Sequence, residues 1–162
     1  MADSTPDPDE TMARITASVT KGRACDSESA RLEMLSIWDD IGVDGDPFHR
    51  CTLAHYLADL FKHPAQALIW DVRALDAADE LTDQRARRFE AGLQVAAFYP
   101  SLHLNIADNL RRLSAFDAAQ EHIEAAQRAC SSLGDDDYGQ FIKNSIDFVG
   151  EKIARHDRAD AS

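Results

Sequence analysis

Apolar residues along this chain recur every three or four positions, the spacing of one face of an α-helix, and nowhere alternate as in a β-strand. The first stripe consists of Met12, Ile15 and Val19, and similar stripes continue as far as Ile153. Glycine and proline are sparse and fall mostly at the breaks between stripes. The pattern therefore predicts an all-α fold.

Capping residues and prolines divide this pattern into helical hairpins. Asp46-Pro47 and His63-Pro64 each place a proline at the first position of a helix, where its missing N–H needs no partner. From such breaks we predict three hairpins and a last helix, over residues 12–40, 48–80, 83–133 and 137–156.

The stretch 83–113 permits two interpretations. Only Gly92 and Pro100 interrupt its helical composition. A residue that precedes a proline is disfavoured in the α region, so Tyr99 marks either a kink or a boundary between two helices. We expect one long kinked helix, because no turn residues accompany the proline.

Small residues recur in pairs that suit closely packed hairpins. The pairs, 12 or 13 residues apart, are Ala17 with Ala30, Ala54 with Ala67, and Ala107 with Ala119. An alanine on each of two successive helices lets their backbones approach, and repeated hairpins indicate a helical solenoid. The alanines expected to be buried at helix–helix contacts are Ala54, Ala67, Ala107, Ala119 and Ala126.

Large and small residues follow a specific order over 100–129. They are His103, Ile106, Ala107 and Leu110 on the first helix, and Ala119, Ile123 and Ala126 on the second. This order resembles a tetratricopeptide repeat, and the hairpins at 12–40 and 48–80 resemble degenerate copies of it. The resemblance implies a right-handed, tetratricopeptide-like (TPR-like) solenoid of about three repeats with a C-terminal capping helix that solvates its end. It also implies that the first helices line a concave ligand surface.

Length and composition predict how the chain is divided. Its 162 residues are enough for one domain with a real core, and 44% of them are hydrophobic and 28% charged, as in ordinary globular proteins. Residues 1–10 hold four acids, two prolines and no base, which predicts a disordered acidic N-terminus. A single TPR-like domain is expected over 11–157, with a frayed tail over 158–162.

The net charge of −12 limits the partners. Like charges repel, so nucleic acid and anionic membrane surfaces are not expected partners, whereas a neutral or basic one is. Cys25, Cys51 and Cys130 form no CxxC motif, and no secretory segment precedes them, which fits a reducing compartment. No apolar run approaches the ~18–20 residues that span a bilayer, so we expect a cytoplasmic protein.

The resemblance also supplies candidate binding residues. Positions one turn from the buried stripe would face the concave surface, and these are His55, Asp59, Leu104, Asp108 and Arg111. Asn105 stands where family members that bind chaperone tails carry the asparagine of a carboxylate clamp. The flanking helices lack the lysine or arginine of that clamp, so the mixture of residues predicts a partner with both apolar and charged groups.

The sequence shows no motif for catalysis. GxSxG, HExxH, P-loop and GxGxxG patterns are all missing, so we expect no enzyme activity. Cys51 and His55 have the spacing of two metal ligands, but no second pair accompanies them and Cys51 fits the apolar stripe. We therefore expect no metal and no cofactor.

Two functions remain open from the sequence. The leading one is a non-enzymatic helical-repeat module that binds a protein or peptide, and it rests partly on fold analogy. The alternative is a small-molecule-sensing regulatory domain with a pocket beside the helix over 83–113. That pocket would be lined by Cys51, His55, Tyr56, Tyr99 and His103. An open groove would favour the first function and an enclosed pocket the second. The sequence predicts neither the partner's identity nor the oligomeric state.

Overall fold

The computed structural model of the chain describes residues 9–24, 26–89 and 94–160. Within these ranges the chain forms eight α-helices and two short 3₁₀-helices, η1 (Val95–Ala97) and η2 (Cys130–Ser132), and no strand. The α-helices are α1 (Glu10–Arg23), α2 (Ser27–Ile41), α3 (Pro47–Ala58), α4 (Pro64–Asp79), α5 (Asp83–Phe89), α6 (Tyr99–Arg112), α7 (Phe116–Ala129) and α8 (Asp137–Ala154). The predicted all-α class is confirmed.

Both ends of the described chain are more ordered than the composition predicts. Residues 1–8 of the expected disordered segment lie outside the described residues, but Asp9 caps α1 by accepting from the N–H of Met12 at 3.0 Å. At the other end, the carbonyl of Ala159 accepts from both Arg111 and Lys152. The tail is therefore held against α6 and α8 as far as Asp160.

Local capping chemistry explains where the helices begin. Asp46 accepts from the N–H of Phe48 at 2.8 Å at the start of α3, and Asp136 accepts from the N–H of Gly139 at 2.8 Å at the start of α8. Pro47 and Pro64 lie in the first turns of α3 and α4, as predicted. These caps satisfy backbone donors that have no partner within their own helix.

The prediction of one long helix over 83–113 is wrong. Helix α5 ends at Phe89, Gln94 has extended backbone angles, and α6 starts at Tyr99. The side chain of Asp83 accepts from the N–H of Val95 at 3.0 Å, so the chain doubles back onto the start of α5. Pro100 lies in the first turn of α6, where a proline starts a helix rather than kinking one.

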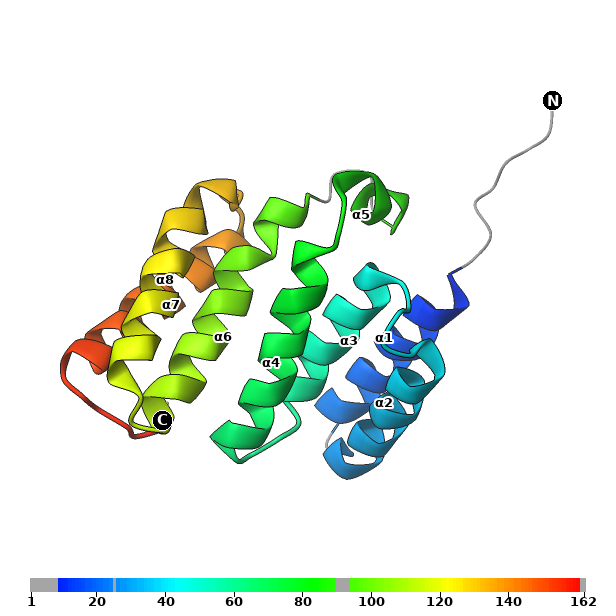
Figure 1. Cartoon of the computed structure of the whole chain (residues 1–162), viewed down its shortest axis with the longest axis horizontal. Coiled ribbons are helices and arrows are strands. Elements are labelled where there is room, and N and C mark those ends of the chain that lie inside the picture. Colours follow the sequence, from blue (N-terminus) through cyan, green and yellow to red (C-terminus); the bar gives the residue numbers. More distant parts are fainter. Residues whose placement is uncertain (1–8, 25, 90–93, 161–162) are drawn as a thin grey trace.

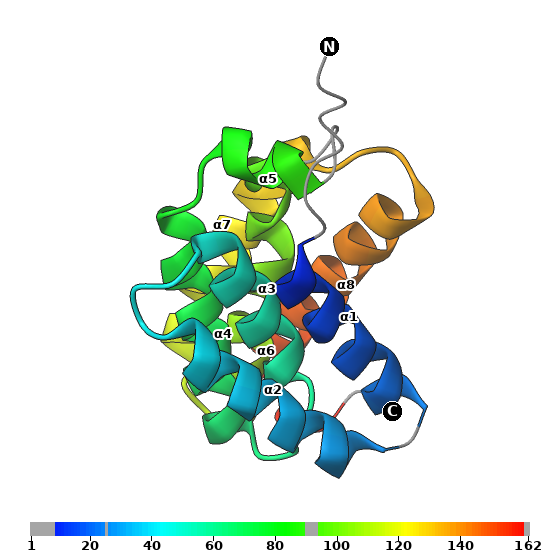
Figure 2. The same cartoon turned by 90° about the vertical axis from the view of Figure 1, so that its right-hand side faces the viewer.

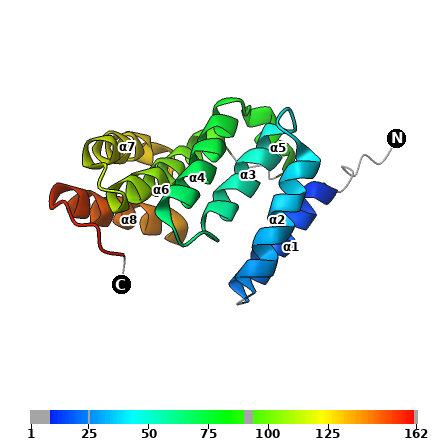
Figure 3. The ribbon, with the colours of Figure 1, turned by 60° about the horizontal axis from the view of Figure 1, so that its bottom comes forward.

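The helices pack as successive hairpins along one direction. Helix α1 contacts α2, α3 contacts α4, and α6 contacts α7, while α4 joins the second hairpin to the third (Figure 1). Helices α3 and α6 run in the same direction on either side of α4. Two further views show α1 and α8 projecting to the same side of the layer that contains α3, α4 and α6 (Figures 2 and 3).

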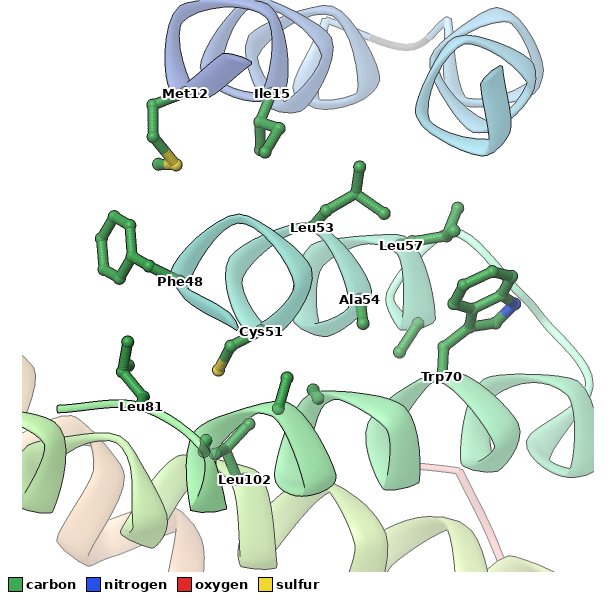
Figure 4. Close-up of a cluster of buried hydrophobic side chains, with 14 of the residues drawn as sticks. Met12, Ile15, Phe48, Cys51, Leu53, Ala54, Leu57, Trp70, Leu81 and Leu102 are labelled. Carbon is green, nitrogen blue, oxygen red and sulfur yellow. The ribbon is translucent and has the colours of Figure 1, made fainter. Parts of the chain in front are cut away.

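Two apolar clusters make up the core. The first joins α1–α4 with the beginning of α6, and the second joins α6, α7 and α8. In the first cluster, α3 lies between two layers: Leu53 points toward α1 and α2, whereas Cys51 and Ala54 point toward α4 (Figure 4). The five alanines predicted to be buried are at most 5% exposed.

The small-residue register of the first hairpin differs from the prediction by one position. Ala17 is exposed, and its neighbour Ser18 is fully buried instead. Ser18 lies 12 residues before Ala30, the same offset that separates Ala107 from Ala119. A serine is small enough to serve where alanine was expected, so the search for alanine alone selected the wrong residue.

The close approach of α6 and α7 can be tested by overpacking. Ala119 is fully buried, so we expect Ala119→Leu to force neighbouring side chains aside and destabilise the fold by about 1–3 kcal/mol in urea unfolding. Gln120→Leu, at an exposed position on the same helix, serves as the control and should change stability little. Equal stability of Ala119→Leu and the parent would contradict the observed register.

Candidate functional site

A cavity of about 360 Å³ opens between α1, α3 and the start of α6, and we call it the apolar cavity. Helix α1 lines it with Met12, Ile15, Thr16, Val19, Thr20 and Arg23. Helix α3 lines it with Phe48, Cys51, Thr52, His55 and Tyr56. Phe89, Phe98, Ser101, Leu102 and Tyr138 complete the wall. The cavity thus draws on three separate hairpins and on α8.

Arg85 of α5 holds the part of this cavity that Phe48 lines, at the start of α3. Its Nε donates to Asp46 at 2.6 Å and its Nη2 to Asp9 at 3.2 Å. Its guanidinium also lies over the ring of Phe48, 4.9 Å from the centroid. One side chain thereby joins the caps of α1 and α3 and positions an aromatic wall of the cavity.

Burial favours the neutral forms of two residues in the apolar cavity, Cys51 and His55. Burial raises the pKa of the Cys51 thiol to about 12, so this sulfur stays protonated and is not a nucleophile at neutral pH. Burial also lowers the pKa of His55, although the nearby carboxylate of Asp59 opposes the shift. The Nδ1 of His55 is buried without a hydrogen-bond partner in the described chain. The cavity therefore combines apolar walls with a few uncharged polar groups and with one basic residue, Arg23.

A second, smaller cavity of about 190 Å³ lies between the C-terminal halves of α3 and α6, and we call it the polar cavity. Its lining residues are Ala58, Asp59, Phe61, Ala67, Asp71, Asn105, Asp108, Asn109 and Arg112. Asp71 of α4 is only 1% exposed. It accepts from Asn109 Nδ2 at 2.8 Å and from Asn105 Nδ2 at 3.4 Å. A buried carboxylate from α4 is thus held by two amides from α6.

The environment of Asp71 opposes its ionisation. Its pKa is raised to about 7, and burial is the largest cause. The carboxylates of Asp59 and Asp108 also raise the pKa, whereas the hydrogen bonds from the two asparagine amides lower it. Asp71 is therefore only partly ionised near neutral pH.

Four of the six predicted site residues line the two cavities. His55 lines the apolar cavity, and Asp59, Asn105 and Asp108 line the polar cavity. These four residues belong to α3 and α6 or follow directly on α3.

The other two predicted site residues, Leu104 and Arg111, lie elsewhere and are buried. Leu104 packs in the core cluster with α7 and α8. Arg111 is paired with Asp108 at 2.7 Å and donates to the carbonyls of Asp157 and Ala159. Helix α8 and the C-terminal tail cover this part of α6, so neither side chain is free to contact a partner.

The sequence interpretation missed Asp71 and Asn109. Asp71 lies between Ala67 and Ala74, at the spacing of the buried stripe of α4. An acid within such a stripe was the available signal, because a carboxylate is rarely buried without polar partners.

The structure brings together three of the five residues that the sequence analysis groups in a small-molecule pocket. Cys51, His55 and Tyr56 line the apolar cavity, but Tyr99 and His103 do not. The Tyr99 hydroxyl donates to Asp79 at 2.7 Å, and His103 Nδ1 lies 2.9 Å from His122 Nδ1. The cavity is beside α1 and α3, away from those two side chains.

Comparison with family models, curated proteins and solved structures finds no match for this chain. Among the described residues, no three histidine, cysteine or acidic side chains are arranged to hold a metal ion. No helix in the same ranges combines the length and apolar character that crossing a membrane requires. The function therefore has to be argued from the geometry of the two cavities.

The raised pKa of Asp71 predicts a pH-dependent stability. Unfolded, this carboxyl titrates near 3.8, whereas in the folded protein its pKa is about 7, so the folded state binds the extra proton between these values. The free energy of unfolding includes the full contribution of this proton below pH 3.8. That contribution falls by up to about 1.4 kcal/mol per pH unit as the pH rises from 3.8 to 7, and it is lost above pH 7.

Urea unfolding from pH 5 to 8 tests this. We expect the parent to lose up to about 3 kcal/mol relative to Asp71→Asn across this range. His55, His103 and His122 have lowered pKa values, so their contribution to stability increases with pH, opposite to that of Asp71. Both proteins contain these histidines, so the difference between the two curves reports on Asp71. Asp76→Asn, an exposed change on the same helix, should run parallel to the parent. Parallel curves for the parent and Asp71→Asn would refute the raised pKa.

Proposed function

We propose that this protein is a non-enzymatic, TPR-like helical-repeat module that binds a segment of another protein along α1, α3, α6 and α8. The observation that carries the proposal is the apolar cavity, because its walls come from one face of three successive hairpins. A surface shared between hairpins suits an elongated partner, which contacts several repeats at once.

Equivalent positions of the three hairpins support this proposal. The first helices carry their small buried residues at Ser18, Ala54 and Ala107. Six positions before these lie Met12, Phe48 and Ser101, and all three line the apolar cavity. A repeated register that brings corresponding residues to one cavity is what a solenoid with a concave binding face requires.

The last helix adds an aromatic wall to this surface. Tyr138, Phe141 and Phe148 of α8 are 54%, 65% and 49% exposed, so α8 is not the polar, solvating cap that the sequence predicts. Spacings of three and seven residues place them on one side of the helix, and Tyr138 lines the apolar cavity. Exposed aromatic residues that continue from a cavity are typical of protein interaction surfaces.

The cavity residues also support a binding rather than a catalytic role. The Cys51 thiol is protonated, and the hydroxyl of Ser101 donates to the carbonyl of Phe98 at 3.0 Å rather than to a base. A nucleophile needs an adjacent base or a lowered pKa, and neither side chain has one.

The net charge of −12 favours a neutral or basic partner, and the cysteine content is that of a cytoplasmic protein.

A small-molecule-sensing regulatory domain is the second candidate. It is favoured by the cavity volume of about 360 Å³, which lies within the range of small-molecule sites, and by the unpartnered Nδ1 of His55. The exposed aromatic wall of α8 has no role in this alternative, and for that reason we place it second.

Selection from a random peptide display library on the intact protein tests the proposal. Enriched peptides should bind the parent and lose at least tenfold in affinity to Thr16→Trp, because the indole would occupy the cavity. Thr52→Trp, which fills the cavity from α3, should act in the same way. Ile69→Trp, at an exposed residue that lines neither cavity, is the control.

Circular dichroism and thermal unfolding should establish that each of these variants is folded. Peptides that bind Thr16→Trp and the parent equally would move the site away from the apolar cavity. Saturable binding of apolar fragments, with no enriched peptide, would replace the proposal with the small-molecule alternative.

A further inference from the structure

The two cavities follow one another along the same pair of helices. On α3 the apolar cavity ends at Tyr56 and the polar cavity continues at Ala58 and Asp59. On α6 the apolar cavity ends at Leu102 and the polar cavity begins at Asn105. Since α3 and α6 run in the same direction, the apolar cavity lies between their N-terminal halves and the polar cavity between their C-terminal halves (Figure 1).

The helix rise gives the distance between the two cavities. Cys51 and Asp59 are eight residues apart on α3, which corresponds to about 12 Å. Ser101 and Asp108 are seven residues apart on α6, which corresponds to about 10 Å. A ligand that reaches both cavities therefore needs two groups separated by about 10–12 Å.

The polar cavity contains a buried carboxylate without a cationic partner. No lysine or arginine in the described chain forms an ion pair with Asp71 or with Asp59. Arg112, the one basic residue of the lining, donates to Asp160 at 2.8 Å, to the carbonyl of Lys62 at 3.1 Å and to Asn109 Oδ1 at 3.3 Å, so its guanidinium is already engaged. Aspartate is almost never fully buried unless it is paired, and the partners of Asp71 in the described chain are two neutral amides rather than a cation.

We propose that the polar cavity receives the cationic end of a lysine or arginine side chain from the partner segment, while a large apolar side chain of that segment fills the apolar cavity. This inference rests on the proposed function, because it specifies the chemistry of the segment that is bound. Asp71 accepts hydrogen bonds at the base of the cavity, and Asp59 lies at its edge.

Charge and size both fit a cation. Of the three carboxylates in the lining, Asp108 is paired with Arg111, whereas Asp59 and Asp71 form no ion pair with a lysine or arginine of the described chain. The whole chain carries a net charge of −12, which attracts a basic segment. A span of about 10–12 Å corresponds to an apolar and a basic residue three positions apart in an extended segment, or seven apart in a helix.

A guanidinium titration tests the polar cavity without any peptide. Propylguanidinium, added to the intact protein, should shift the side-chain NH₂ signals of Asn105 and Asn109 in a saturable way. Neutral propylurea should not. The response should be lost in Asp71→Asn and weakened at least threefold in Asp59→Asn, an exposed change that leaves the Asp71 hydrogen bonds intact. Thr16→Trp, which fills only the apolar cavity, should retain it.

Three results of this titration would overturn the inference: no saturable shift, an equal shift with propylurea, or an undiminished response in both aspartate variants. If the Asp71→Asn protein fails to fold, the Asp59→Asn protein decides the result.

Peptides selected on the intact protein test the pairing of the two cavities. Replacing the basic residue of such a peptide with norleucine should weaken binding to the parent at least tenfold. The same replacement should have little effect on binding to the Asp59→Asn, Asp71→Asn double variant.

The two proposals fail in different ways. Peptides that bind the parent equally with and without their basic residue would overturn this inference and leave the proposed function standing. A positive guanidinium titration with no enriched peptide would instead overturn the proposed function, and with it the assignment of the cation to a protein segment.

Discussion

The hydrogen bonds between Asp71 and the asparagines of α6 hold the molecule together at its centre. One core cluster belongs mainly to α1–α4 and the other to α6–α8, and the packing of α4 on α6 joins them. Asn109 and Asn105 donate to the Asp71 carboxylate at this junction. A carboxylate removed from water without partners would destabilise the fold, so these amides fix how α6 sits beside α4. That placement in turn sets the separation of α3 and α6, and therefore both cavities.

The repeated register explains why the surface changes along the molecule. Corresponding positions of the first helices, Met12, Phe48 and Ser101, all reach the apolar cavity. Three positions before the small residue, however, Ile15 and Cys51 line this cavity whereas Leu104 is covered by α7 and α8. In the third hairpin this position therefore belongs to the core and not to the cavity. The exposed aromatic side chains next to this hairpin come from α8.

Features that depend on a few neighbouring residues could be predicted from the sequence. The caps at Asp46 and Asp136 and the buried alanines belong to this class, because a helix start or a close helix pair is specified within one hairpin. Pro100 marked Tyr99 as a kink or a boundary, but the sequence did not decide between them, since the reversal of the chain depends on Asp83 accepting from the N–H of Val95. The burial of Arg111 depends likewise on a C-terminal tail more than 40 residues away. In the site, His55, Asp59, Asn105 and Asp108 line the cavities, but the burial of Leu104 and Arg111 and the position of Asp71 depend on packing between hairpins and were not predicted.

The distribution of charge determines which ligand the proposed binding surface would favour. The chain has 17 basic and 29 acidic residues. Four of the basic residues, Arg50, Arg85, Arg111 and Arg112, are largely buried and form ion pairs within the protein. Arg85 joins the caps of α1 and α3, and Arg111 holds the C-terminal tail, so these cations serve the fold. The carboxylates left over cannot all be neutralised internally, and Asp59 and Asp71 remain beside a cavity. The apolar cavity is followed along α3 and α6 by the carboxylates of Asp59 and Asp71. This arrangement favours a ligand with one apolar and one cationic end, because the apolar end fills the cavity and the cationic end pairs with the carboxylates.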